Sequence, residues 1–386
     1  MWYLQADTLV WILGSTLLYG LAAAILHRVS PQRRLTPFLL LFDLGLLFFV
    51  SWQLALFYVG YTLVTYAMLR ILKAAKGQRL RKILFVLFCA LCAAPFFYAR
   101  FALMLPFLPA IFTLVGFAYN MLKAIDGVFY VYYADKDIPL LAYANFLLFF
   151  PVLTSGPILR YRDFERDYHY LAPKPVTAQV TTDAVKRLIR GMFKKMVLVA
   201  LLGLVLDRLL AARLCLPVSL ALIVVSYFTL YFDLSGYSDI AIAVASFTGF
   251  SVAENFKNPL TAASFTQFWR KWHVTLSDWI REHIFVVVNG KRLGRPASAA
   301  IGMCTMLVMS MWHGFSVKNL VCGAFMGGLL ALENLLNLTT ADRRRMPEGI
   351  FRLRCLAVNF AFGINALSFS MDLGQMADVV KGLFRL

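Results

Sequence analysis

The run VSLALIVVSYFTLYFDLSGYSDIAIAVASFT, residues 218–248, decides the fold, because it stays apolar for longer than a single bilayer crossing requires. A helix of about 20 apolar residues already crosses a membrane. Comparable runs recur along the 386 residues, of which 61% are hydrophobic and 15% charged, whereas soluble domains carry about 25% charged residues. One soluble core cannot bury so many helices at this length. The sequence therefore predicts an all-α polytopic membrane protein.

We expect about eleven membrane helices together with re-entrant or interfacial pieces. The first apolar run, residues 8–26, lacks a basic start and is followed by HRVSPQRR, so it is typical of an uncleaved membrane helix rather than a signal peptide. The remaining spans are expected at residues 37–70 (two short helices with a break near VSWQ), 83–98, 101–122, 139–158, 196–212, 218–248, 297–316, 318–338 and 355–385 (one span or two short ones).

The net charge of +18 comes from basic residues that lie in the connectors between apolar runs. Such charges orient helices and contact lipid headgroups, so they do not indicate nucleic-acid binding. The basic connectors at residues 27–34 and 72–82 are expected on the cytoplasmic side. The six cysteines lie mostly in apolar runs, as small buried hydrophobes do. Cys89 and Cys92 form a C-x-x-C without a second ligand pair, which leaves a redox or metal role as the weaker alternative.

The stretch SFTQFWRKWHVTLSDWIREHIF, residues 264–285, is too charged to be a free transmembrane span. Its Ser264 and Gln267 fit a capping box and predict a helix that starts near Phe265. We expect this helix to be interfacial or re-entrant, and tryptophans on its apolar stripe are typical of an interfacial anchor. His273 and Asp278 lie off the centre of the stripe and are able to face a cavity. The stripe consists of Trp269, Trp272, Leu276, Trp279 and Ile280.

His313 lies in MSMWHGFSV, residues 309–317, without a charged partner within one helical turn. Ionisable side chains at membrane depth are rare and are functional candidates by default. Desolvation favours the neutral imidazole, which is a competent general base. From the residues alone, His313 is a catalytic base, a proton relay in a transporter, or a structural residue. A serine nucleophile at Ser310 is a weaker alternative, and the H-E-x-x-H signature of metalloproteases is absent from the sequence.

Four motifs in this order resemble the membrane-bound O-acyltransferase family in its bacterial polysaccharide branch. The motifs are GPILRYRDF (156–164), YFDLSGYSDIAIAVASFTGFSVAENFKNPL (231–260), FWRKWHVTLSDWIREHIF (268–285) and MWHGFS (311–316). The resemblance implies one acyltransferase domain over residues 1–386, with a ring of tilted helices around a central funnel. It covers the motif-bearing core at residues 115–340, while residues 1–114 and 341–386 would supply the N-terminal and C-terminal helices.

The resemblance also implies roles for individual residues. The histidine of the family's WHG motif corresponds to His313, which would deprotonate the acceptor hydroxyl or assist its attack on a thioester carbonyl. The earlier WH histidine corresponds to His273, which would orient the substrate or stabilise developing charge. No metal is expected. The candidate substrate-binding residues are Trp312, Trp272, Asp233, Tyr237, Asp239, Asp278 and Arg281.

The implied donor is an acyl thioester on the cytoplasmic side of a bacterial inner membrane, carried by the phosphopantetheine of an acyl carrier protein or by coenzyme A, with no bound cofactor. The carrier's acidic face would dock on Lys291, Arg292 and Arg295. The implied acceptor is a cell-envelope polysaccharide or teichoic acid, reached either directly or through a periplasmic or extracellular acyltransferase.

Two features of the sequence disagree about the acyl group. The short chain and the segment TSGPILRYRDFERDY, residues 154–168, resemble the D-alanyl branch, whereas the compact connector NGKRLGRP, residues 289–296, resembles the acetylating branch. We expect D-alanyl transfer, with acetyl transfer to an exopolysaccharide of the alginate or cellulose type as the alternative. A proton-coupled transporter or flippase is a remote alternative, because the paired repeats typical of transporters are not seen.

Overall fold

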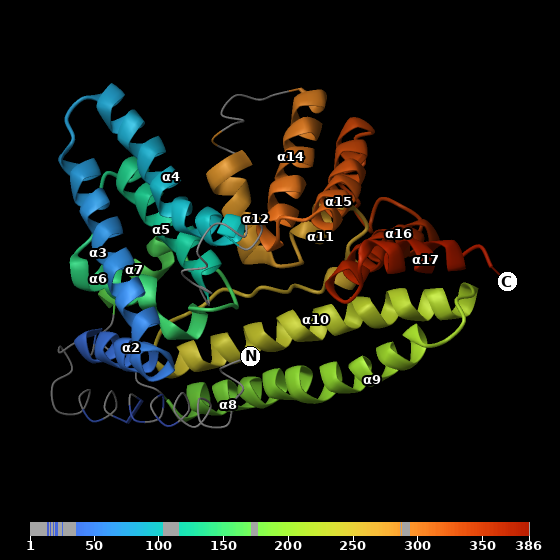
Figure 1. Ribbon diagram of the computed structural model, residues 1–386, viewed down its shortest axis with the longest axis horizontal. Coiled ribbons are helices and arrows are strands. Elements are labelled where there is room, and N and C mark those ends of the chain that lie inside the picture. Colours follow the sequence, from blue (N-terminus) through green and yellow to red (C-terminus); the bar gives the residue numbers. More distant parts are fainter. Residues whose placement is uncertain are drawn as a thin grey trace. The chain divides into compact units, whose positions relative to one another are not determined.

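The computed structural model describes residues 36–102, 116–170, 177–285, 287 and 294–385, with positions 14, 16, 18, 20, 21 and 25. Every regular element in these residues is a helix (Figure 1). The expected spans at 8–26 and 101–122 and the connector at 289–296, including Lys291 and Arg292, fall largely or wholly outside them. Two compact units are formed, Met1–Ile189 with Asp239–Ala253 and Arg190–Ser238 with Glu254–Leu386. They do not follow the boundaries at 114 and 340, and the single-domain organisation stays a prediction.

From position 36 on, the first unit has two consecutive apolar helices, α2 (Thr36–Val50) and α3 (Trp52–Ala74), of which α3 is long enough to cross a membrane. Ser51 separates them, because its hydroxyl accepts a hydrogen bond from the backbone N–H of Leu54 at 3.3 Å and so caps α3. The break expected near VSWQ is thereby confirmed. The next helices are α4 (Gln78–Ala102), α5 (Phe117–Tyr133), α6 (Leu140–Leu148), the 3₁₀ turn η2 (Phe150–Val152), α7 (Tyr161–Tyr170) and α8 (Ala178–Met192).

Helices α3 and α4 expose large apolar side chains along their length. Examples on α3 are Leu56 and Leu63, and on α4 Ile83 and Val86, each about half exposed or more. Soluble proteins seldom show so much apolar surface to water. Lipid contact explains these faces and agrees with the membrane character expected from composition.

The single span expected at residues 139–158 is wrong, because α6 ends at Leu148 and irregular backbone follows. Proline and glycine residues in this segment, including a left-handed Gly156 (φ 103°), prevent a continuous helix. Irregular backbone at membrane depth needs hydrogen-bond partners from the protein itself.

Two charged side chains satisfy the backbone around the end of α6. Asp43 of α2 is fully buried and accepts a hydrogen bond from the N–H of Phe150 at 3.3 Å. Lys123 of α5 is equally buried and donates to the carbonyl oxygen of Leu147 at 2.6 Å. These contacts hold the non-helical segment inside the first unit.

The second unit contains most of α10 (Leu216–Phe247), the long helix expected from residues 218–248, whose last turns belong to the first unit. Helices α14 and α15 lie side by side in this unit (Figure 1). The run expected at residues 355–385 forms two helices, α16 and α17, and α16 together with η6 is long and apolar enough to cross a membrane. Besides α10, the unit has η3 (Phe193–Leu198), α9 (Val199–Leu210), η4 (Pro259–Thr261), α11 (Phe265–Trp269), α12 (Val274–Ile280), η5 (Arg281–Phe285), α14 (Arg295–His313), α15 (Val317–Leu335), α16 (Glu348–Ala366), η6 (Leu367–Phe369) and α17 (Leu373–Gly382).

Within the described part of the chain, four helices are long and apolar enough to cross a membrane. They are Trp52–Ala74, Gln78–Phe101, Leu216–Phe247 and Glu348–Phe369, and Pro37–Val50 is a shorter apolar helix. The all-α membrane fold is therefore confirmed. The number of about eleven spans and their arrangement as a ring around a funnel stay predictions.

Candidate active site

The corner between α14 and α15 fixes the position of His313, the last residue of α14. The helices approach closely at Gly323, where a Cβ atom would stand 2.9 Å from the Cβ of Ser310. The side-chain amide of Asn319 donates to the carbonyl oxygen of Gly314 at 2.7 Å, and the hydroxyl of Ser310 donates to the carbonyl oxygen of Asn319 at 2.6 Å. The backbone after His313 is thus held by two hydrogen bonds, and one of them uses the Ser310 proton.

The helix expected over residues 264–285 is broken in two, so the single continuous stripe is wrong. Helix α11 begins at Phe265, as the capping box predicted, but it ends after a short run. His273 then adopts left-handed backbone angles (φ 44°, ψ 51°) immediately before α12. Trp269, Trp272 and Leu276 of the expected stripe nevertheless line one cavity, because the turn brings them together.

Two polar side chains from distant segments hold this broken helix in place. Glu333, buried on α15, accepts hydrogen bonds from the backbone N–H groups of Phe265 at 2.7 Å and Thr266 at 2.8 Å. A carboxylate at this end of a helix is favoured by the helix dipole. On the other side of the turn, the side-chain oxygen of Asn255 accepts from the N–H of Thr275 at 3.2 Å and from its hydroxyl at 2.9 Å. His273 lies between these two anchors.

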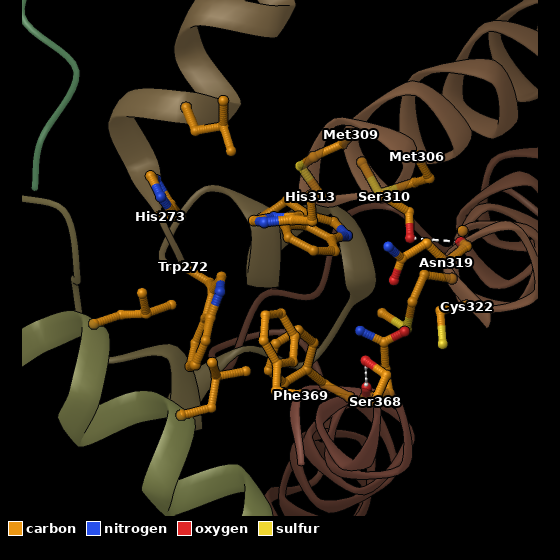
Figure 2. A pocket seen from close by; sticks show the side chains of 18 of the residues that line it. Trp272, His273, Met306, Met309, Ser310, His313, Asn319, Cys322, Ser368 and Phe369 are labelled. Carbon is orange, nitrogen blue, oxygen red and sulfur yellow. Dashed lines mark hydrogen bonds between the residues drawn. The ribbon is translucent and has the colours of Figure 1, made fainter. Parts of the chain in front are cut away.

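His273 and His313 line the same cavity of about 300 Å³ within the second unit. Figure 2 shows His273 and Trp272 on one side of His313, with Ser310 and Asn319 on the other. Most of the lining is apolar, and no acidic side chain contributes to it among the residues that the structure describes. The cavity therefore combines two imidazole rings with a largely apolar wall.

His273 is the more buried of the two histidines, with 6% of its surface exposed. Burial, aided by repulsion from His313, lowers the pKa of His273 to about 3, so its ring is neutral at physiological pH. Its Nδ1 atom is buried and has no hydrogen-bond partner in the described part of the chain. An unpaired buried polar atom costs stability unless a ligand or water pairs with it. A neutral imidazole in this position is able to hydrogen-bond a substrate.

His313 is exposed, whereas the sequence predicted a desolvated ring, so the desolvation that we expected there applies to His273. Burial depends on long-range packing, which an apolar run does not reveal. The ring of His313 packs edge-to-face against Trp312, with ring centres 4.9 Å apart, and against Phe369 at 5.8 Å. These contacts orient the ring and leave it accessible. A general base must be within reach of the proton that it takes.

Of the expected substrate-binding residues in the second unit, Trp272, Asp278 and Arg281 line cavities and Trp312 does not. Trp272 lines the histidine cavity, while Trp312 contacts the His313 ring without lining the cavity. Asp278 and Arg281 form an ion pair at 2.8 Å and line a second cavity of about 310 Å³. Both cavities are lined by Trp269, Met306 and Met309, which form a shared wall between them.

Asp233, Tyr237 and Asp239 of α10 are not brought to the histidine cavity. Asp233 forms an ion pair with Lys195, and Asp239 forms one with Arg187 at 3.0 Å. Both carboxylates therefore have structural partners. A substrate role for these three residues stays a prediction.

Sequence reasoning missed several residues that line the histidine cavity. They include Lys318, Asn319, Asn365 and Phe369. The position of Lys318 soon after the motif histidine His313 was the available indication, although a lysine near the end of a span is common in itself. Asn365 and Phe369 carried no such indication, because their approach depends on how α16 and η6 pack.

Comparison with known proteins identifies related sequences. A sequence model described as MBOAT, the membrane-bound O-acyltransferase family, matches residues 38–350. A teichoic acid D-alanyltransferase of Streptococcus thermophilus is 28% identical over 365 residues, 87% of this chain and 83% of that protein. A probable alginate O-acetylase of Pseudomonas fluorescens is 33% identical over 236 residues, 60% of this chain and 47% of that protein. The chain thus spans about half the length of the alginate relatives that it matches.

Proposed function

Because this chain belongs to the membrane-bound O-acyltransferase family, we propose that it moves an acyl group from a cytoplasmic thioester donor to a hydroxyl group of a cell-envelope polymer. The observation that carries the proposal is the cavity in which His313 and His273 meet from two separate segments. His313 is accessible, as a group that takes a proton from the substrate has to be. His273 is buried and neutral, which suits a group that forms a hydrogen bond with the substrate.

In the proposed reaction His313 takes the proton of the acceptor hydroxyl as that oxygen attacks the thioester carbonyl. The carbon–sulfur bond then breaks, and the leaving thiolate receives the proton from the His313 imidazolium. His273 contributes a neutral ring whose unpaired Nδ1 is available to bond the developing oxyanion. The apolar lining limits the access of water, which would otherwise hydrolyse the thioester.

We assign D-alanyl as the transferred group, delivered by a phosphopantetheine thioester on a carrier protein. Support comes from the Streptococcus thermophilus D-alanyltransferase, whose similarity extends over most of both chains. Acetyl transfer is the second candidate, because the probable alginate O-acetylase has the higher identity over a shorter segment. The donor in that case is an acetyl thioester such as acetyl-coenzyme A.

We place the protein in the cytoplasmic membrane of a bacterium. The acyl group reaches the polymer either directly or through a further envelope acyltransferase that relays it.

The test uses the full-length protein, purified and reconstituted in liposomes. D-alanyl and acetyl thioesters of a phosphopantetheine carrier are supplied together with an oligo(glycerol phosphate) acceptor. We expect His313→Ala to lower the rate of ester formation by about 10²- to 10⁴-fold, the usual contribution of a general base. His283→Ala is the matched control. The ring of His283 stacks on that of Trp279 with ring centres 4.2 Å apart, and His283 does not line the cavity.

Thermal unfolding shows whether both variants remain folded. Normal ester formation by a folded His313→Ala protein would overturn the catalytic assignment. Absence of transfer by the wild-type protein from either thioester, combined with proton-driven uptake of a solute, would favour the transporter alternative. The thioester that is consumed faster identifies the acyl group.

A further inference from the structure

Lys318 places a positive charge in the wall of the histidine cavity. It is the second residue of α15, and its side chain is half-buried. The ammonium group donates to the carbonyl oxygens of Ser368 at 2.6 Å and Met371 at 3.0 Å. Because an ammonium has three N–H donors, these contacts hold it in place and leave one donor without a partner in the described part of the chain.

The charge of Lys318 lies close to the reacting centre. Ser368 and Phe369 are consecutive residues of η6, and the ring of Phe369 packs against that of His313 at 5.8 Å. Lys318 and His313 also line the same cavity. A group bound at the ammonium therefore shares the cavity with a hydroxyl that His313 is able to deprotonate.

Within the described residues, no carboxylate compensates this charge. The described residues that line the cavity include no aspartate or glutamate, and Lys318 forms no ion pair in them. A half-buried cation in an apolar wall is costly unless an anion accompanies it. The start of α15 adds the positive end of a helix dipole, which favours an anion further.

Asn365 adds a second unsatisfied polar group to the same wall. Its side-chain oxygen is buried without a hydrogen-bond partner among the described residues, and the residue lines the cavity. A carbonyl oxygen of this kind accepts a hydrogen bond from a hydroxyl group. A cationic donor and a neutral acceptor on one wall match a ligand that carries an anionic group and hydroxyl groups together.

We propose that Lys318 forms an anion subsite for the acyl acceptor, which holds a phosphate or carboxylate group of the polymer beside the hydroxyl that His313 activates. This rests on the proposed acyl transfer and adds that the acceptor is an anionic polyol. The acceptor fits the subsite better than the donor does. In a phosphopantetheine thioester the phosphate is separated from the sulfur by the whole pantetheine arm, whereas a glycerol phosphate or a uronic acid carries its charge a few bonds from a hydroxyl.

The test compares three acceptors of equal length on the reconstituted full-length protein: oligo(glycerol phosphate), an oligouronate and a neutral maltooligosaccharide. The variants are Lys318→Gln, Lys318→Arg and the control Lys381→Gln, which removes a lysine paired with Asp378 on exposed α17. We expect Lys318→Gln to raise KM for the preferred anionic acceptor about tenfold or more, as the loss of one charge-assisted hydrogen bond does. KM for the thioester and for the neutral acceptor should stay unchanged.

Binding of fluorescently labelled acceptors, measured by anisotropy, gives a readout that does not depend on turnover. Lys318→Arg should restore most of the affinity, and added salt should weaken the binding of anionic acceptors to the wild-type protein. The preferred acceptor distinguishes phosphate from carboxylate. An equal rise in KM for charged and neutral acceptors, or a loss of thermal stability that accounts for all effects, would show that Lys318 only supports η6 and would overturn the subsite.

Failure of the subsite and failure of the proposed function are distinguishable in this experiment. If the wild-type protein esterifies acceptors regardless of their charge, acyl transfer stands and the anion subsite falls. If it esterifies none of them from any thioester, the proposed function itself falls, and the subsite with it.

Discussion

His273 combines a strained backbone with a buried and unpaired ring, and a residue needed only for packing requires neither. Its left-handed φ of 44° is uncommon for a residue other than glycine, although histidine, like asparagine and aspartate, adopts it more often than most. Its Nδ1 is buried without a partner in the described residues. Strain and unsatisfied polarity together are typical of functional positions. These two features support its assignment to the reacting centre beside His313.

Replacing His273 with glycine tests this assignment while keeping the backbone conformation, because glycine adopts left-handed angles freely and supplies no side-chain donor. We expect kcat for acyl transfer to fall about a hundredfold, as the loss of one oxyanion donor commonly does. KM for the acceptor should change little. Steady-state kinetics of the reconstituted protein measures both parameters, and an unchanged kcat would remove His273 from the mechanism.

The low pKa of His273 also predicts how stability depends on pH. An unfolded histidine has a pKa of about 6.5, whereas folding lowers that of His273 to about 3. Between these values the unfolded chain binds the extra proton, so stability falls as the pH falls, by about 1.4 kcal/mol per pH unit. Unfolding of His273→Gly in detergent, followed from about pH 7 to pH 4, should show a weaker decline than the wild type. Parallel declines would contradict the buried neutral ring.

At the scale of elements, the α14–α15 hairpin depends on close approach at Gly323. A Cβ at this position would stand 2.9 Å from Ser310 Cβ, whereas at Gly328 nothing lies within 4 Å. Gly323→Ala should therefore lower stability by about 1–3 kcal/mol through overpacking. Gly328→Ala is the matched control and should be neutral or stabilising by up to about 1 kcal/mol.

The readout for the hairpin is thermal unfolding together with acyl transfer. Gly323 also lines the histidine cavity, so its alanine variant should lose activity even at temperatures where it stays folded. Equal effects of the two alanine variants would show that helix spacing does not position His313.

The sequence predicts elements well where a local pattern defines them. Ser51 and Ser264 mark helix starts that the structure confirms, because a side-chain cap involves only neighbouring residues. The break at His273 was not predictable in this way. It depends on Glu333 and Asn255, which hold the two sides of the turn from distant parts of the chain. A helical wheel treats the segment as isolated and therefore places its tryptophans on one continuous face.

At the scale of the whole molecule, composition predicted the membrane fold, since apolar runs and exposed apolar helix faces follow from hydropathy alone. The candidate site was predictable in part, because two motif histidines do meet in one cavity. The positions of Asp233 and Asp239 were not, since an ion pair with a basic residue of another helix is invisible in a single sequence.

The orientation of the chain yields a further prediction. The connector between α3 and α4 is basic and contains exposed Lys76, so the positive-inside rule places it on the cytoplasmic side. A Lys76→Cys variant in a background without the native cysteines should react with a membrane-impermeant maleimide in inside-out vesicles. Labelling in right-side-out vesicles instead would reverse the predicted orientation.

The shared wall of Trp269, Met306 and Met309 bears on a problem that any acyl-transferring membrane protein faces, namely leakage of ions. The wall offers two thioethers and an indole but no charged group on which a hydrated ion could rest. Narrow apolar constrictions exclude water and so form a barrier to ions. Methionine side chains rotate readily, so this wall is able to yield to a small neutral group while it offers an ion no polar contact. An acyl transfer that ran between the two cavities would therefore open no path for ions along these three residues, and the membrane potential would be kept.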